Sequence, residues 1–256
     1  MQGQGGPRAA QAGACRWTRE GEGRPLLSAS PSAQARYLGC PHRAAALRRR
    51  GLTVRPIARE AVLNPQTFTL TGPARAGLRR KLRHAAQAGV AVTEPDRLPL
   101  PEMAEVARLW AARQGQERGW SMGRWDSDYV AGQRVLTARD GAGRLVAFVS
   151  FHASRREWVL DLIRATEPMP DGTLYALIVA ALDAARREGV DRLSLAAVPL
   201  RDLGLPPLLA PLVRHALRRS EGLVQFKQAF APRWERRYIA ARGPVRLALA
   251  GMMVVW

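Results

Sequence analysis

Lysine is almost absent from this chain. Of its 256 residues 40 are basic, yet Lys81 and Lys227 are the only lysines and every other basic residue is arginine. A sequence that uses arginine for surface charge has little need of lysine there. Each retained lysine is therefore a candidate for a task that needs a compact ammonium rather than a planar guanidinium. The alternative is that the two lysines have no special role.

Cysteine and histidine are also scarce. The two cysteines are Cys15 and Cys40, and neither they nor the four histidines fall at the spacings of a zinc site. We therefore expect neither a structural metal ion nor a disulfide framework. The histidines, expected at surface or packing positions, are His42, His84, His152 and His215.

The sequence lacks a hydrophobic run long enough to cross a membrane. Its longest apolar segment is LALAGMMVVW at residues 247–256, about half of the roughly 20 residues that a spanning helix needs. We expect residues 244–256 to form an apolar C-terminal helix that docks on the core or lies in a membrane interface. Residues 1–35 show no apolar stretch typical of a signal peptide, so the expected location is cytoplasmic.

Positive charge is abundant. The formal net charge is +19, and residues 1–99 account for +12 of it, with 17 basic and 5 acidic side chains. Such a surface attracts polyanions, which means nucleic acid or an anionic bilayer.

Four regions follow from the composition. Residues 1–36 are low in complexity and are expected to be disordered, because they offer little apolar surface to a core. Residues 37–99 and 100–243 alternate helical and extended patterns, before the apolar segment at 244–256. The order of these patterns predicts an α+β fold with a central mixed sheet. The expected elements are helices at 41–50, 73–88, 102–118, 171–189 and 208–219 and strands at 52–57, 90–93, 134–139, 145–151, 158–164, 192–197 and 237–241.

Asp161 is a charged residue inside the apolar strand EWVLDLIRA. An unpaired carboxylate there would cost several kcal/mol, roughly, so it should have a partner, and Arg164 is the nearest candidate. Simple alternation puts residues three apart on opposite faces of a strand, but a β-bulge would bring them to one face. The pair is either a structural ion pair or part of an active site.

Lys227 lies in the segment GLVQFKQAFAPRWERRY. Phe226, Phe230 and Trp234 repeat at four-residue spacing and are expected to be buried, which would leave Lys227 on a less buried neighbouring surface. A lone lysine beside an aromatic anchor suits a phosphate or a developing oxyanion. A solvated lysine beside a core aromatic row would give the same pattern.

Several motifs occur together in one order. They are FTLTGPARAGLRRKLRHAAQAGV, ERGWSMGRWDSDYV, GRLVAFVSF, LDLIRATEPMPDGTLYAL, LSLAAVPL and GLVQFKQAFAPRWERRYIA. In this combination residues 37–243 resemble the synthase domain of the phosphatidylglycerol lysyltransferase family, also called multiple peptide resistance factor.

The resemblance implies a tandem pair of GNAT-like acyltransferase lobes, of which residues 37–99 would be a truncated remnant of the first, with a basic linker helix, and 100–243 the synthase lobe. It implies an aminoacyl-tRNA co-substrate, no other cofactor, and phosphatidylglycerol as acceptor, at the inner face of the cell membrane. In LSLAAVPL, residues 196–198 stand where the family commonly has Gly-Met-Ala.

The resemblance also assigns residues. The family's D-L-x-R motif falls on Asp161 and Arg164, and its F-K motif on Phe226 and Lys227, so Asp161, Arg164 and Lys227 are the implied catalytic residues. Its R-x-x-R-K helix falls on a basic stripe implied to bind tRNA or phosphate. The stripe consists of Arg75, Arg79, Arg80, Lys81 and Arg83.

Two other functions remain open. A coenzyme A dependent N-acyltransferase would share the fold, but the loop ATEPMPDGT, with Pro168 and Pro170, is a poor cradle for a pyrophosphate. A non-catalytic remnant or an RNA-binding module derived from the enzyme is the second alternative.

Overall fold

The structure is a computed structural model in which two compact units are described. Each unit is assembled from segments that are distant in the sequence. The first unit comprises 1–60, 197–220 and 235–256, and the second 61–196 and 221–234. The described residues within them are 36–38, 41–114, 125–200, 221–243 and 247. Three expected features lie outside the described residues: the disordered segment, the helix at 208–219 and most of the apolar C-terminal segment. The domain boundaries expected at 36, 99 and 243 stay a prediction.

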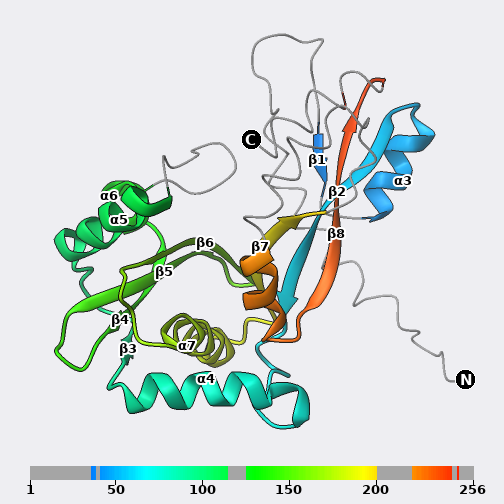
Figure 1. Cartoon of the computed structure of the whole chain (residues 1–256). Coiled ribbons are helices and arrows are strands. Elements are labelled where there is room, and N and C mark those ends of the chain that lie inside the picture. The colour runs from blue at the N-terminus through cyan, green and yellow to red at the C-terminus, as the bar shows by residue number, and fades with distance from the viewer. Residues whose placement is uncertain (1–35, 39–40, 115–124, 201–220, 244–246, 248–256) are drawn as a thin grey trace, which may run out of the picture. The chain divides into compact units, whose positions relative to one another are not determined.

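The first unit is built on three strands in the order β1 (Arg36–Leu38), β8 (Arg233–Ala241) and β2 (Thr53–Leu63). β1 and β8 are antiparallel, and helix α3 (Pro41–Arg49) precedes β2 (Figure 1). β2 is longer than the expected strand at 52–57, because its residues stay largely buried as far as Leu63.

The second unit contains a mixed sheet. Its strands run in the order β7 (Arg192–Pro199), β6 (Glu157–Ala165), β5 (Leu145–Ala153), β4 (Arg134–Arg139) and β3 (Ala91–Thr93). The pairs from β3 to β6 are antiparallel, whereas β6 and β7 are parallel and are joined through a helix. Antiparallel strands followed by one parallel crossover confirm the expected α+β, GNAT-like fold.

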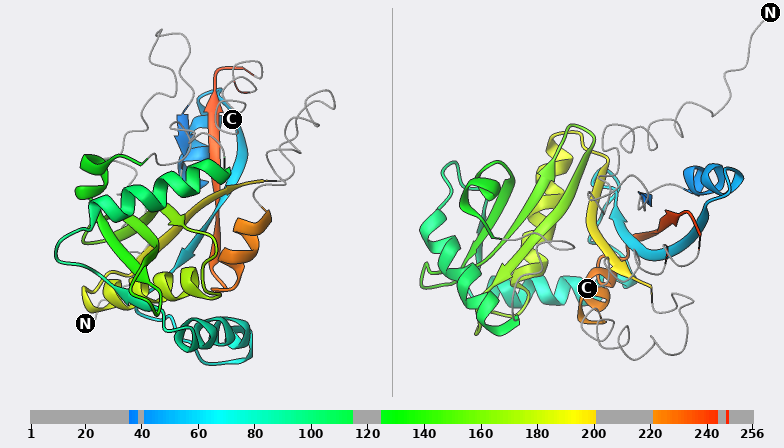
Figure 2. Two further views of the ribbon diagram at one scale, coloured as in Figure 1. Left: turned by 60° about the vertical axis from the view of Figure 1, so that its left-hand side comes forward. Right: turned by 90° about the horizontal axis from the view of Figure 1, so that it is seen from above.

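Helices cover both faces of this sheet. Helix α7 (Thr173–Arg187) packs on one face, and α4 (Ala76–Gln87) lies outside α7. Helices α5 (Leu100–Gln114) and α6 (Ser127–Ala131) cover the other face (Figures 1 and 2). Two separate apolar clusters, one on each face, fill these interfaces.

The sequence of α7 explains its position. Leu177, Ile178, Ala181 and Leu182 recur at helical spacing and are fully buried against the sheet. Gly172 precedes the helix with φ +89° and lies directly against the backbone of α4, where a β-carbon would overlap a carbonyl group. Glycine is therefore required at this position for both its conformation and its size.

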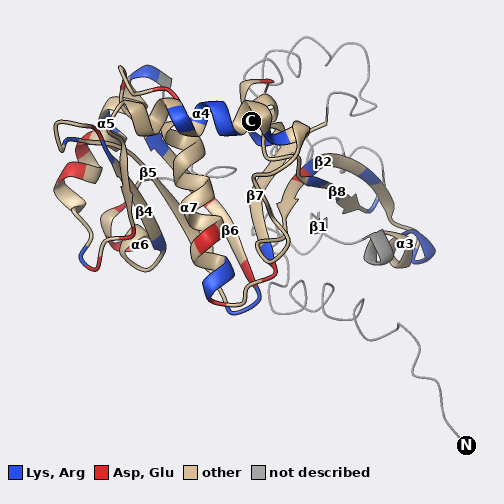
Figure 3. Ribbon diagram, turned by 90° about the horizontal axis from the view of Figure 1, so that it is seen from below, with Lys and Arg blue, Asp and Glu red and all other residues tan. Residues whose placement is uncertain are grey.

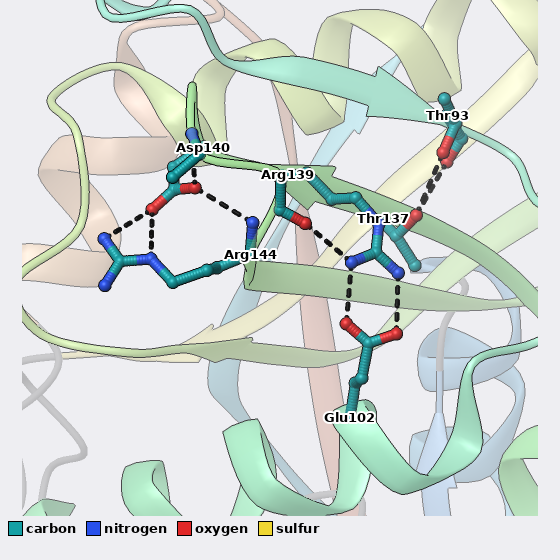
Figure 4. A network of polar contacts seen from close by, with 8 residues as sticks. Thr93, Glu102, Thr137, Arg139, Asp140 and Arg144 are labelled. Atoms are coloured by element: carbon teal, nitrogen blue, oxygen red, sulfur yellow. Dashed lines mark hydrogen bonds and ion pairs between the residues drawn. The ribbon is translucent and has the colours of Figure 1, made fainter.

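Polar contacts fasten the β4–β5 hairpin to α5. Arg139 donates two hydrogen bonds to Glu102, at 2.6 and 2.7 Å, and a third to the carbonyl of Gly143 (Figure 4). Asp140 accepts hydrogen bonds from Arg144 across the turn, and these lower the pKa of its carboxyl. The contacts join the turn of the hairpin to α5.

Candidate functional site

The candidate site lies where β6 and β7 separate. Their parallel pairing ends at Val159 and Ser194, although both strands continue beyond this point. Two residues beyond this last pair, the chain reaches Asp161 on β6 and Ala196 on β7. Counted from the last pair, these two residues lie at the same position along the two strands.

Both strands are irregular at this level. On β6 the register with β5 passes from Leu160 opposite Phe151 to Leu162 opposite Ser150, so Asp161 is the extra residue of a β-bulge. On β7 Ala196 has φ +63°, which is unusual for a residue other than glycine. The β-bulge that would bring Asp161 and Arg164 to one face of the strand is thus present.

Asp161 is held by residues other than the expected arginine. Its carboxylate accepts a hydrogen bond of 2.8 Å from Gln133 and lies 3.6 Å from Nε2 of His152. Its side chain is 12% exposed, so it is largely removed from water but reachable. Arg164 is not its ion-pair partner among the described residues, and the ion pair expected between the two is wrong.

A polar cluster of four residues surrounds this carboxylate: Asp161, Gln133, Tyr129 and His152, which we call the Asp161 cluster. The hydroxyl of Tyr129 lies 3.1 Å from Nε2 of His152. Burial, and then hydrogen bonding to the Asp161 carboxylate, raise the pKa of Tyr129 to about 12. His152 was expected at the surface or in packing. Gln133 and Tyr129 were not expected in the site, although Tyr129 lies in the motif ERGWSMGRWDSDYV, because no local pattern marks their contact with Asp161.

Arg164 follows the bulge on the α5 side of β6. Its guanidinium carbon lies 3.9 Å from the ring centroid of Trp110, and the residue is 3% exposed. Stacking on an indole is a favourable setting for a guanidinium that is removed from water. Because of the bulge, Asp161 and Arg164 both contact the helices of this face, as a shared site requires.

Lys227 is buried, which corrects the expectation of a less buried surface. It is 3% exposed, and its ammonium donates a hydrogen bond of 3.0 Å to the carbonyl of Ala196. Burial lowers the pKa of Lys227 to about 8. The ammonium thus reaches the same level of the sheet as Asp161, from the β7 side.

The four-residue aromatic spacing around Lys227 does not form one continuous helical face, because the helix is short. Residues 221–228 are helical, and the chain then turns at Ala231, which has φ +38°, so Trp234 already belongs to β8. Phe230 is fully buried, while Phe226 and Trp234 are only partly buried. Phe226 and Phe230 both contact Tyr175 of α7, and this packing fixes the helix that carries Lys227.

Two arginines of the basic stripe are used within the fold. Arg79 donates hydrogen bonds of 2.7 and 2.8 Å to the carbonyls of Leu70 and Gly72. Arg75 lies over the ring of Phe68, with its guanidinium carbon 4.7 Å from the centroid. Both side chains hold the segment before α4, and their assignment to phosphate stays a prediction.

The rest of the stripe divides into a paired and an exposed part. Lys81 lies 2.8 Å from Asp171, which also contacts His84, and hydrogen bonds from these two residues hold the pKa of Asp171 below its usual value. Arg80 and Arg83 are exposed and make no ion pair with the described residues. Figure 3 shows the basic residues along α4.

The start of α7 offers little to a pyrophosphate. A phosphate cradle needs free backbone N–H groups at this helix terminus, without negative charge nearby. Here the carboxylate of Asp171 and the backbone of α4 at Lys81 occupy the terminus, and Pro168 and Pro170 lack the N–H group. This terminus is therefore a poor match to a pyrophosphate cradle.

Comparison with known proteins agrees with this geometry. A family profile described as "Phosphatidylglycerol lysyltransferase, C-terminal" matches residues 28–241. Phosphatidylglycerol lysyltransferase of Bacillus subtilis is 26% identical over 215 residues, which are 77% of this chain and 25% of that protein. The lysylphosphatidylglycerol biosynthesis bifunctional protein LysX of Mycolicibacterium gilvum is 31% identical, over 76% of this chain and 19% of that protein.

Solved structures give the same result. The structure of L-PGS from Bacillus licheniformis superposes with a TM-score of 0.70 at 25% identity, over 84% of this chain and 69% of that one. The C-terminal domain of a putative lysylphosphatidylglycerol synthetase from Agrobacterium fabrum gives 0.69 at 25% identity, over 85% and 70%. The fold is thus that of an acyltransferase-like domain.

The chain belongs to the phosphatidylglycerol lysyltransferase C-terminal family, as the resemblance of its motifs implied. It spans about a quarter or a fifth of the length of the curated relatives that it matches. No helix in the described part of the chain is long and apolar enough to cross a membrane.

Proposed function

We propose that this protein transfers an aminoacyl group, with lysyl as the first candidate, from aminoacyl-tRNA to a glycerol hydroxyl of phosphatidylglycerol. Membership of the lysyltransferase family supports the acceptor and the reaction class. The observation that carries the proposal within the structure is that Lys227, in the position of the family's F-K motif, is buried with its ammonium on the carbonyl of Ala196.

The reaction is an ester exchange, so it needs placement and charge stabilisation more than activation. Lys227 and Arg164 are buried cations in a region of low dielectric constant, where they interact strongly with a phosphate or an oxyanion. We assign them to the lipid phosphate and to the oxygen that gains charge in the transition state. Asp161 orients the polar groups around it rather than Arg164.

The co-substrate is proposed to be aminoacyl-tRNA rather than coenzyme A. The net charge of +19 favours a polyanionic donor. Arg80 and Arg83 of α4 are the members of the basic stripe best placed to contact tRNA phosphates, since the structure leaves them exposed. The same positive charge would hold the protein at the anionic inner face of the cell membrane.

The test is lipid extraction after the full chain has been incubated with tRNA charged with labelled lysine and with phosphatidylglycerol vesicles. We expect label in the lipid fraction, and none with phosphatidylcholine vesicles or after the charged tRNA has been hydrolysed. Repeating the assay with a mixture of labelled aminoacyl-tRNAs identifies the amino acid. Binding of tRNA without transfer of any amino acid would contradict the proposal and favour the RNA-binding alternative.

A further inference from the structure

The Asp161 cluster has the arrangement of a proton relay. Its carboxylate is largely buried, while the imidazole of His152 is 51% exposed at the end of β5. A carboxylate that is removed from water beside an accessible imidazole is a setting in which histidine can act as a base. The fold builds this arrangement with the bulge, which turns Asp161 out of the regular strand toward α6.

The contact with Tyr129 bears on which nitrogen of His152 is basic. Nε2 of His152 lies 3.1 Å from the hydroxyl oxygen of Tyr129. The inference takes the tautomer in which Nε2 carries the hydrogen and donates it to this oxygen. Nδ1 is then the unprotonated nitrogen, and it makes no hydrogen bond to the described residues.

The rings reinforce this orientation. Tyr129 and His152 pack edge to face, with centroids 5.8 Å apart. Gln133 holds the carboxylate of Asp161 from the other side at 2.8 Å. The imidazole is thus fixed by contacts from α6 and β6, although half of its surface faces solvent.

We propose that His152 accepts the proton of the attacking hydroxyl at Nδ1 and that Tyr129 and Asp161 position it for this step. The inference rests on the acyl transfer proposed above. As the hydroxyl oxygen of the acceptor forms its bond to the acyl carbon, its proton passes to Nδ1. The bond from the acyl carbon to the ribose oxygen then breaks, and that oxygen receives the proton from the imidazolium.

The experiment compares transfer of labelled lysine from lysyl-tRNA to phosphatidylglycerol vesicles by the full chain and its variants. His152→Ala should lower kcat about 100-fold, the usual order for loss of a general base. Imidazole added to the solution should restore part of the rate, because it can occupy the vacated space. KM for the vesicles should change little, since His152 does not hold the lipid phosphate.

Two further variants separate catalysis from structure. Tyr129→Phe keeps the ring but removes the oxygen that holds Nε2, so it should lower kcat less than His152→Ala and should not respond to imidazole. Arg155→Ala is the matched control, because Arg155 is exposed on the same β5–β6 hairpin and its side chain makes no hydrogen bond or ion pair with the described residues. It should leave kcat unchanged.

Each outcome supports or overturns the proposed role of His152. Loss of kcat with rescue by imidazole supports the role of His152. Activity of His152→Ala near that of the unchanged protein, or a loss that imidazole does not repair, would overturn the role while the transfer function stands. Absence of transfer by the unchanged protein would overturn both.

Discussion

Replacing Lys227 by methionine should stabilise the fold while it removes transfer activity. Lys227 is 3% exposed, and burial lowers the pKa of its ammonium to about 8 from 10.5. One pKa unit corresponds to about 1.4 kcal/mol, so keeping this group charged costs the folded protein about 3 kcal/mol at neutral pH. Methionine has a similar shape and carries no charge.

The variant also loses a contact. The carbonyl of Ala196 would no longer receive its hydrogen bond from Lys227, which costs about 1 kcal/mol or somewhat more. The net effect at pH 7 is therefore a gain of about 1 to 2 kcal/mol in the free energy of unfolding. For a chain of this size, that gain raises Tm by roughly 4 °C.

The dependence on pH is the sharper test. Because the pKa of Lys227 is lower in the folded chain, the unfolded chain binds more protons between pH 8 and pH 10.5. The free energy of unfolding of the unchanged protein should therefore rise with pH across this window, and methionine should abolish that contribution. Between pH 7 and pH 9 the advantage of the variant should shrink by about 1 kcal/mol.

Urea unfolding of both proteins at pH 7, 8 and 9 measures this difference, since other titrating groups contribute equally to both. The lipid-transfer assay on the same samples reports activity. Parallel stability curves would refute the burial of a charged lysine at this position. Full activity of the variant would refute its role in the site.

Two further predictions concern α4. Gly172→Ala should lower Tm strongly, because the added β-carbon would overlap the carbonyl of Lys81. Gly143→Ala, also at positive φ but in open space, should cost only about 1 kcal/mol. Thermal unfolding compares the two variants, and equal losses of stability would contradict the close approach of Gly172 to α4. Replacing Arg80 and Arg83 together by glutamine should weaken tRNA binding and reduce its salt dependence, because two phosphate contacts are lost. Titration at several salt concentrations checks this, and an unchanged slope would remove the two arginines from the interface.

The sequence was sufficient for those parts of the fold that depend on repeated local patterns. The apolar spacing of α7 predicted its buried face, and the antiparallel strands follow their expected positions closely. The bulge at Asp161 could also be suggested from the sequence, because simple alternation would put Asp161 and Arg164 on opposite faces of the strand. In each case the neighbouring residues in the sequence are enough to predict the feature.

The partners of these residues could not be predicted from the sequence. The contacts of Asp161 with His152 and Gln133 join residues 9 and 28 positions apart, and no motif connects them. The burial of Lys227 depends on where its helix stops, and the four-residue aromatic spacing continued past the turn at Ala231. Such contacts are fixed by tertiary packing rather than by periodicity.

The backbone conformation at Ala196 bears on a sequence difference between this chain and its family. The family commonly has glycine where this chain has Ala196, and φ +63° at this position explains that preference, since an alanine held there costs about 1 kcal/mol or more. The conformation aims the carbonyl of Ala196 at the ammonium of Lys227. Strain of this kind persists only where the surrounding packing enforces it. Here the carbonyl of Ala196 receives the hydrogen bond of Lys227, and the helix at 221–228 that carries Lys227 is packed on Tyr175 of α7.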